Sequence, residues 1–314
     1  MNCPICNSDK SSFLYHLYDD RYGYHGLFSL LRCGACTHVY LDCDLSPADI
    51  QRLYTEFYPR SEYDVKDYRP HKEIGVFRAW LDGACGSAFR WVSGGVKVLD
   101  IGCGFGETLG YHQARGCEVQ GVEADENIRR VAEHYGFNVK VGLFDGNNYP
   151  EEYFDYVTMD QVLEHVKDPV PVMHDVARVI KSEGVLVLSF PNASGWGQRI
   201  FGRRWINWHV PYHMQFYSRQ SIAMLAAEAG FTVKTIRTVT SSAWLRMQWA
   251  HLLLYPEHGV PSEFWGKVSE RSLYSSIICK MAGFLHMIKV NHLLSRLFDA
   301  CGLGDNFIVV LKKK

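Results

Sequence analysis

Apolar runs of strand length alternate with amphipathic stretches of helix length over the middle of the chain. The stretch 126–136 has helical spacing and ends at Gly136, and another helix begins at Asp168 and Pro169. Continuously apolar runs such as 184–192 are typical of buried parallel strands. The alternation predicts an α/β fold with a doubly wound, mostly parallel sheet. The predicted strands lie within 96–109, 117–125, 137–142, 153–160, 184–192, 231–240 and 305–314.

The two flanks of this region have different patterns. Residues 13–32 resemble short strands or a hairpin, and 46–95 carries apolar positions at helical spacing. The tyrosines of the second stretch either cap a pocket or simply pack; they are Tyr54, Tyr58, Tyr63 and Tyr68. We expect a zinc-ribbon-like module in 1–45, a helical linker or cap in 46–95, a main domain in 96–240 with 305–314, and a helical insertion in 241–304, either a lid or an interface.

Composition narrows the classes of function. The chain has 314 residues, 47% of them hydrophobic, with a formal net charge of -1, so it lacks the overall basic charge typical of nucleic-acid-binding proteins, and a local basic patch stays open. No signal peptide begins the sequence. Charged residues interrupt the most apolar stretch, 272–290, so no transmembrane segment is expected. These features predict a cytoplasmic protein, where its ten cysteines would serve as metal ligands or buried thiols rather than disulfides.

Four cysteines form two Cys-x-x-Cys pairs, Cys3 with Cys6 and Cys33 with Cys36. Each such turn directs two thiolates at one point, and two turns make the tetrahedral set that zinc prefers. Asn7 and Gly34 tolerate the positive φ that tight turns need. A closed set of four thiolates leaves no coordination position free, so we expect a structural zinc ion that stabilises the small module. Unrelated buried thiols and a redox pair are the alternatives.

A glycine-rich turn follows the first strand of the main domain. Gly102, Gly104 and Gly106 come directly after Asp100 and before a helix start, so a ligand can approach the backbone closely there. Glu123 ends the next strand about 20 residues later, where a carboxylate can accept hydrogen bonds from a ribose diol. The spacing is GxGxG rather than the dinucleotide GxGxxG, and a nicotinamide site is the alternative.

Four stretches together resemble class I S-adenosylmethionine-dependent methyltransferases: VLDIGCGFGETL, GVEAD, FDYVTMDQVLEHVKDPV and ARVIKSEGVLVLSFPN. The resemblance implies a seven-stranded Rossmann-like sheet whose last strand, 305–314, is antiparallel. It is nearest to the branch with a Glu-His-Val turn, shared with ubiquinone-pathway O-methyltransferases. The element with four cysteines resembles that of deoxysugar C-methyltransferases and their relatives in polysaccharide and natural-product clusters.

The resemblance also implies a set of cofactor-binding residues. Asp100, Gly102 and Gly104 would hold the methionine part of S-adenosylmethionine, Glu123 the ribose, and Phe144 with Asp145 the adenine. Gln161 would line the cofactor near its sulfonium. Glu164 and His165 follow one helical step later. These two residues are either part of the active site or a hydrogen-bonded pair that fixes the loop.

The stretch NWHVPYHMQFYS, residues 207–218, follows the fifth strand, where open α/β sheets bind ligands. His213 matches a His-x-x-x-[FY]-Ser element of the resembling family and is our first candidate for a general base. His209 is the second candidate, with Tyr212 as an orienting partner, and a structural histidine is the alternative. A metal pair of the two histidines is disfavoured, because Pro211 breaks the helix that ligands at i and i+4 require.

A histidine base suits an acceptor that must lose a proton, such as a sugar hydroxyl or an α-carbon acid. Arg199, Arg203 and Arg204 lie upstream and either bind the oxygens of a diphosphate or form a solvated basic loop. We therefore predict methyl transfer to a sugar or nucleotide-linked sugar. The alternatives are an RNA methyltransferase, which the near-neutral charge disfavours, and a non-catalytic relative that binds the cofactor. A homodimer stays open.

Overall fold

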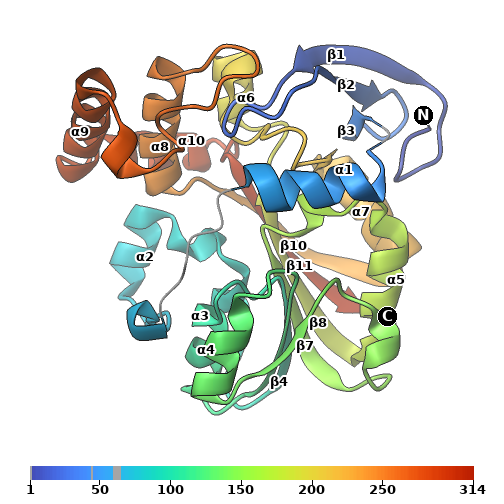
Figure 1. Cartoon of the computed structure of the whole chain (residues 1–314). Coiled ribbons are helices and arrows are strands. Elements are labelled where there is room, and N and C mark those ends of the chain that lie inside the picture. Colours follow the sequence, from blue (N-terminus) through green and yellow to red (C-terminus); the bar gives the residue numbers. More distant parts are fainter. Residues whose placement is uncertain (1, 44, 59–64) are drawn as a thin grey trace.

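The chain folds around two β-sheets, which Figure 1 shows in a computed structural model that describes residues 2–43, 45–58 and 65–314. The larger sheet has seven strands in the order β10-β11-β8-β7-β4-β5-β6, and β11 alone runs antiparallel to its neighbours. This confirms the predicted α/β architecture with a mostly parallel, seven-stranded sheet. Its strands are β4 (Lys97–Ile101), β5 (Glu118–Glu123), β6 (Asn138–Val141), β7 (Phe154–Asp160), β8 (Ile180–Pro191), β10 (Phe231–Val239) and β11 (Asn306–Lys313).

Helices cover both faces of the large sheet. In Figure 1, α3 (Glu107–Gln113) and α4 (Ile128–Tyr135) lie on one side of it, while α5 (Pro169–Val179) and α7 (Arg219–Glu228) lie on the other. Gly136 ends α4 with a φ of 70°. Helix α5 ends at Val179, and the fully buried Ile180 begins β8, where it pairs with Phe154 of β7.

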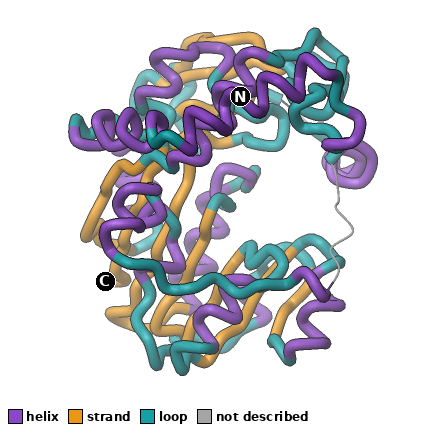
Figure 2. Tube along the Cα trace, turned by 90° about the vertical axis from the view of Figure 1, so that its left-hand side faces the viewer, coloured by secondary structure: helices purple, strands orange, loops and turns teal. Residues whose placement is uncertain are grey.

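The smaller sheet lies above the larger one in Figure 2. Its order is β1 (Ser11–Leu17), β2 (Phe28–Cys33), β3 (Val39–Asp42) and β9 (Gln215–Phe216), all antiparallel. The first three strands come from the N-terminal region, as the sequence indicates. The fourth comes from the stretch 207–218, which lies beyond the large sheet's fifth strand in the sequence. Its pairs are Val39 with Phe216 and Tyr40 with Gln215.

The remaining helices lie near the carboxyl edge of the large sheet. In Figure 1, α1 runs across the centre between the two sheets, and α8, α9 and α10 form a group at the upper left above α2. Short turns of 3₁₀-helix and one π-helical turn, Leu53–Phe57, connect several elements. The helices are α1 (Pro47–Arg52), α2 (Val76–Asp82), α6 (Trp196–Phe201), α8 (Ser242–Leu253), α9 (Leu273–Met287) and α10 (Val290–Ala300).

Helices α9 and α10 expose many large apolar side chains, among them Leu273, Met281, Phe284 and Leu293. No single helix among the described residues is long and apolar enough to cross a membrane. The two helices together meet that length and hydropathy, but their axes are bent by 64°. The homodimer left open by the sequence stays a prediction.

Candidate functional site

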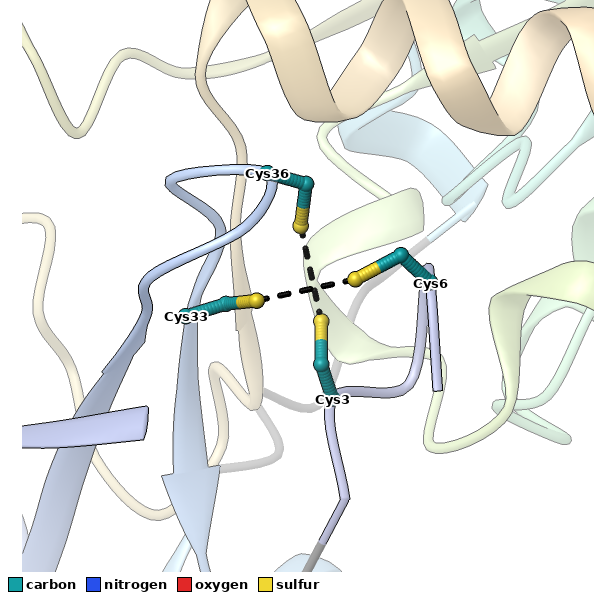
Figure 3. A group of neighbouring side chains, drawn as sticks. All are labelled: Cys3, Cys6, Cys33 and Cys36. Atoms are coloured by element: carbon teal, nitrogen blue, oxygen red, sulfur yellow. Dashed lines mark hydrogen bonds between the residues drawn. The ribbon is translucent and has the colours of Figure 1, made fainter. Parts of the chain in front are cut away.

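The four cysteines of the two Cys-x-x-Cys turns converge on one point (Figure 3). The sulfur atoms of Cys3 and Cys36 lie 3.5 Å apart, as do those of Cys6 and Cys33, and all four lie within 4.8 Å of one another. Tetrahedral zinc with Zn–S bonds of about 2.3 Å separates its sulfurs by roughly 3.8 Å. Three of the thiols are buried and the fourth is partly buried. The arrangement fits a closed zinc site.

The two turns share one backbone geometry. The amide of Asn7 donates to the Cys3 carbonyl at 2.9 Å, and the amide of Thr37 donates to the Cys33 carbonyl at 3.1 Å. Asn7 and Thr37 have φ values of 53° and 60°. The expected positive φ is therefore present at Asn7, but in the second turn it falls on Thr37 rather than on Gly34. Each turn needs it at the residue after its second cysteine, where the chain reverses.

The second turn is tied to the stretch around β9 by side chains. The Nε2 atom of His38, a fully buried residue, lies 2.8 Å from Oε1 of Gln215, whose Nε2 donates to the Lys167 carbonyl at 2.9 Å. The hydroxyls of Thr37 and Ser218 lie 2.8 Å apart. These contacts connect the second cysteine turn to Gln215 of β9 and to Ser218 after it, and Gln215 connects both to Lys167, which follows Glu164 and His165.

A buried carboxylate near the end of β4, that of Asp100, lies just before the glycine-rich turn. Asp100 is 2% exposed and accepts hydrogen bonds from the hydroxyls of Thr108 and Thr158, the latter at 2.6 Å. Burial raises the pKa of Asp100 to about 6, while the two hydroxyls lower it. The neighbouring β7 carboxylate, Asp160, is partly buried and accepts from Ser189 and from the Ala88 amide. Burial raises the pKa of Asp160 to about 6 as well.

Both of the glycines assigned to cofactor binding have a backbone that favours glycine. Gly102 and Gly104 have φ values of 76° and 55°, in the left-handed region. A Cβ on Gly102 would collide with the Val162 side chain, whereas one on Gly104 would meet open space. The Gly104 amide donates to the Glu123 carboxylate at 2.9 Å, which places the end of β5 beside the turn. Burial raises the pKa of Glu123.

The other residues assigned to the cofactor lie along the same sheet edge. Gln161 directly follows β7, and its Nε2 donates to the Ser189 hydroxyl of β8 at 3.0 Å. Phe144 follows β6 and packs on Tyr149 with ring centroids 6.0 Å apart. Asp145 is exposed and accepts from the Asn147 amide at 2.9 Å. Carboxyl ends of parallel strands are where open α/β sheets bind ligands, so the predicted positions share the expected edge.

Glu164 and His213 are buried and form a cluster with His165, which is partly exposed. One ligand-type atom from each lies within 4.8 Å of the others, so the set is also able to hold a metal ion. Neither carboxylate oxygen of Glu164 has a hydrogen-bond partner among the described residues. His209 joins the cluster, with its ring centroid 4.9 Å from that of His213. A tight turn rather than a helix brings these two rings together, closed by the His213 amide donating to the His209 carbonyl at 3.0 Å. The group able to hold a metal contains His213 but not His209, so the disfavoured metal pair of the two histidines stays a prediction.

Burial sets the protonation of this cluster. It lowers the pKa of His165 to about 4 and holds those of His209 and His213 well below the ordinary 6.5. The nearby guanidinium of Arg21 lowers the pKa of all three histidines further. Burial raises the pKa of Glu164 to about 8. At neutral pH the three imidazoles are therefore uncharged and able to accept a proton.

Aromatic rings surround the histidines. Tyr212 packs against His209 with ring centroids 4.8 Å apart, and Tyr54 and Tyr58 each lie 5.5 Å from Tyr212. Tyr22, which sequence reasoning missed, packs against His209 at 5.7 Å. It lies in the N-terminal region, and no sequence spacing connects it to 207–218.

The remaining tyrosines of the proposed cap behave differently. Tyr68 packs on Tyr135 and donates to the Gly106 carbonyl at 3.0 Å, so it supports the glycine-rich turn rather than the histidine cluster. Tyr63 lies outside the described residues. Tyr54 and Tyr58 therefore lie beside the histidine cluster, whereas Tyr68 contacts the glycine-rich turn. Residues that are close in the sequence thus belong to two separate parts of the site.

A cavity of about 610 Å³ opens beside the end of β7. Asp160 and Gln161 line it from the sheet, and residues of α2, α8 and the α9–α10 junction line the rest. The predicted diphosphate ligands lie elsewhere: Arg199, Arg203 and Arg204 are exposed on and after α6, and Arg203 donates to the His16 carbonyl of β1 at 2.7 Å. None of the three lines this cavity.

Known proteins resemble this chain in sequence and fold. The profile of a methyltransferase domain family matches residues 44–236. The ubiquinone biosynthesis O-methyltransferase of Azoarcus sp. (strain BH72) is 31% identical over 160 residues, which cover 48% of this chain and 66% of that relative. The protein of the same name from Thiobacillus denitrificans is 29% identical over 188 residues, covering 55% and 78%. Haemonchus contortus phosphoethanolamine N-methyltransferase 2, solved with S-adenosyl-L-methionine, has a TM-score of 0.51 at 16% identity and covers 84% of this chain and 59% of its own.

The chain belongs to the methyltransferase domain family. The profile spans 44–236, which includes the glycine-rich turn, the Glu-His-Val turn and 207–218. Membership confirms the predicted enzyme class and its Rossmann-like fold. None of the three proteins named above is called a sugar methyltransferase, so the sugar acceptor predicted from the sequence stays a proposal.

The cysteine cluster generates a first prediction. Replacing Cys33 and Cys36 by Ser removes two of four ligands, so the purified protein should lose its bound zinc, measured by elemental analysis. Its free energy of unfolding should fall by several kcal/mol, because metal binding stabilises such modules. Cys301→Ser, at an exposed thiol, is the control and should change neither. A wild-type protein that contains no zinc would defeat the prediction.

The glycine-rich turn generates a second prediction. Gly102→Ala should weaken S-adenosylmethionine binding at least tenfold in calorimetry, because the new Cβ displaces Val162 and moves the turn. Gly95→Ala is a matched control: its φ is 70°, yet a Cβ there meets nothing within 4 Å. The control should cost only about 1–2 kcal/mol of stability for the left-handed backbone and leave binding intact. Equal binding by both variants would remove the turn from the cofactor site.

Proposed function

We propose that this protein transfers a methyl group from S-adenosylmethionine to a small-molecule acceptor, with His213 as the general base. The observation that carries the proposal is the convergence of two parts on one sheet edge. One part is the turn with Asp100, Gly104 and Glu123, and the other is the buried histidine cluster that follows β7 and β8. When bound, the cofactor supplies an electrophilic methyl group.

Residues of the chain would hold the cofactor in a defined way. The Glu123 carboxylate would bind the ribose diol, and the amides of the turn would approach the methionine part closely. Gln161, fixed by its hydrogen bond to Ser189, would lie beside the sulfonium. Phe144 and Asp145 would contact the adenine. Orientation of this kind contributes several kcal/mol to a displacement reaction.

His213 has the tautomer that a base needs. Its Nδ1 lies 2.8 Å from the Asn207 carbonyl, which can only accept a hydrogen bond, so Nδ1 carries the proton and Nε2 keeps its lone pair. The Nδ1 of His165 makes the same kind of bond to the Tyr212 carbonyl at 3.0 Å. The Glu164 carboxyl, which lies close to His213, has its pKa raised to about 8 by burial, so it would be largely protonated at neutral pH and would stabilise an imidazolium only in its ionised form. His209 and Tyr212 would orient the acceptor.

The acceptor must lose a proton as the methyl group arrives, which a sugar hydroxyl or an acidic carbon does with a base. We propose a sugar or a nucleotide-linked sugar as the acceptor. The resemblance of the cysteine element to that of sugar-modifying enzymes supports this class. The relatives named for ubiquinone biosynthesis support a second candidate, a hydroxyl on an aromatic ring, which the apolar wall of the cavity, Phe77, Leu81 and Trp244, would suit. Transfer of labelled methyl to one of the two classes in vitro separates them.

We further propose that the four cysteines hold a structural zinc ion. They offer four sulfur ligands within 4.8 Å of one another, which leaves no coordination position for a substrate. The zinc would act on catalysis through position alone, by holding the strand that pairs with β9.

The role of His213 yields a third prediction. His213→Asn keeps a donor for the Asn207 carbonyl but has no basic nitrogen, so turnover should fall about a hundredfold. Affinity for S-adenosylmethionine in calorimetry should stay within twofold of the wild type, because the change lies outside the cofactor contacts. His174→Asn, at an exposed histidine of α5, is the control and should keep full activity. Wild-type turnover in His213→Asn would exclude the base.

The pH profile yields a fourth prediction. Burial lowers the pKa of His213, so its imidazole stays unprotonated until the pH falls well below 6.5. The acidic limb of the kcat profile should therefore lie below pH 6.5 in the wild type. A limb at or above pH 6.5 would show that a more exposed group limits turnover.

A further inference from the structure

The cavity beside β7 has walls of different chemistry. From the sheet come Asp160 and Gln161, the second of which we place beside the cofactor. From the helices come the first residues of α8 and three basic side chains near the α9–α10 junction: His286, Lys289 and His292. The cavity therefore joins the reacting edge of the sheet to a basic region of the helical segment.

The amino terminus of α8 opens into this cavity. Ser241, Ser242, Ala243 and Trp244 all line it. The N-cap residue Ser241 makes no side-chain capping hydrogen bond, so the first-turn amides of this 12-residue helix receive no side-chain acceptor from it. Such amides, together with the helix dipole, attract an anion.

His292 provides an independent sign of a ligand. It is 1% exposed and lines the cavity, and its Nδ1 has no hydrogen-bond partner among the described residues. Its Nε2 lies 3.2 Å from the Asp82 carboxylate and 3.4 Å from Nζ of Lys289. A buried polar atom without a partner costs about 1–3 kcal/mol, which a hydrogen bond to a bound molecule would offset.

Among the described residues that line the cavity, Lys289 is a cation left available by the charges around it. Arg78 is 3.4 Å from Asp82, which also contacts His292, and Asp160 is held by Ser189 and the Ala88 amide. Lys289 has no carboxylate partner within salt-bridge distance among the described residues. His286 lies next to His292, with ring centroids 4.3 Å apart. Arg246 is the further charge that acts on His286.

We propose that this cavity binds the acceptor through an oxyanion, a phosphate or carboxylate group, held by Lys289, His292 and the first amides of α8. The inference rests on the proposed function, because it places the remainder of the acceptor toward Gln161 and the cofactor. Since the Nε2–H of His292 is directed at Asp82, its Nδ1 donates to the anion only when the ring is protonated. Binding therefore takes up one proton.

Calorimetry on the purified full-length protein tests the binding site without any methyl donor. Pyrophosphate and benzoate represent the two sources of the oxyanion, and glucose is the neutral control. We expect saturable binding of at least one anion and none of glucose. Lys289→Met should weaken that binding about tenfold, since a charge-assisted hydrogen bond is lost. Lys280→Met, at an exposed lysine of α9 outside the cavity, should leave it unchanged.

The proton uptake gives a second readout. Wild-type affinity should rise as the pH falls from 8 to 6, because anion binding favours protonated His292. His292→Gln retains a donor for Asp82 but cannot be protonated, so binding should persist with a smaller dependence on pH.

Absence of saturable anion binding, or equal weakening by Lys280→Met, would overturn the proposal. A protein that binds pyrophosphate but not S-adenosylmethionine would instead refute the proposed function and leave the anion site standing.

Discussion

The pairing of β9 with β3 is the contact on which the proposed site depends. Two residues, Gln215 and Phe216, extend the N-terminal sheet, and the Leu41 amide donates to the Met214 carbonyl at 2.9 Å just before them. On the other side, the Met214 amide donates to the Glu164 carbonyl at 2.8 Å. One residue thus joins the cysteine-bearing sheet to the turn after β7. Because Met214 is hydrogen-bonded to both Leu41 and Glu164, the adjacent residue His213 is held between the N-terminal sheet and the turn after β7.

This constraint explains how a site with few charges can be well ordered. The histidine cluster is buried, so its imidazoles are neutral, and each ring needs fixed partners to define its tautomer. The carbonyls of Asn207 and Tyr212 supply those partners for His213 and His165. Both carbonyls belong to the loop that β9 ends. If the pairing were lost, the loop would be free to move, and the bases would lose their direction before any catalytic group changed chemically.

Much of the fold follows from periodicity in the sequence. Buried strands are continuously apolar, so the seven strands and the order of strand and helix could be recognised, and paired Cys-x-x-Cys turns indicate their own geometry. What joins the parts could not be recognised in this way. Strand β9 has only two residues, too few to show a period, and the closeness of His209 and His213 comes from a tight turn rather than from helical spacing. Tyr22 and the cavity residues of α2 and α8 meet the site only through tertiary packing.

The proposed zinc ion would hold the N-terminal sheet and thereby order the histidine loop. Amide hydrogen exchange, compared between the zinc-loaded protein and the same protein after chelation, tests it most directly. The account predicts faster exchange at Leu41, His213 and Met214 after chelation, with unchanged exchange at the central strands β7 and β8. Unchanged protection of those three amides after complete removal of zinc would contradict it.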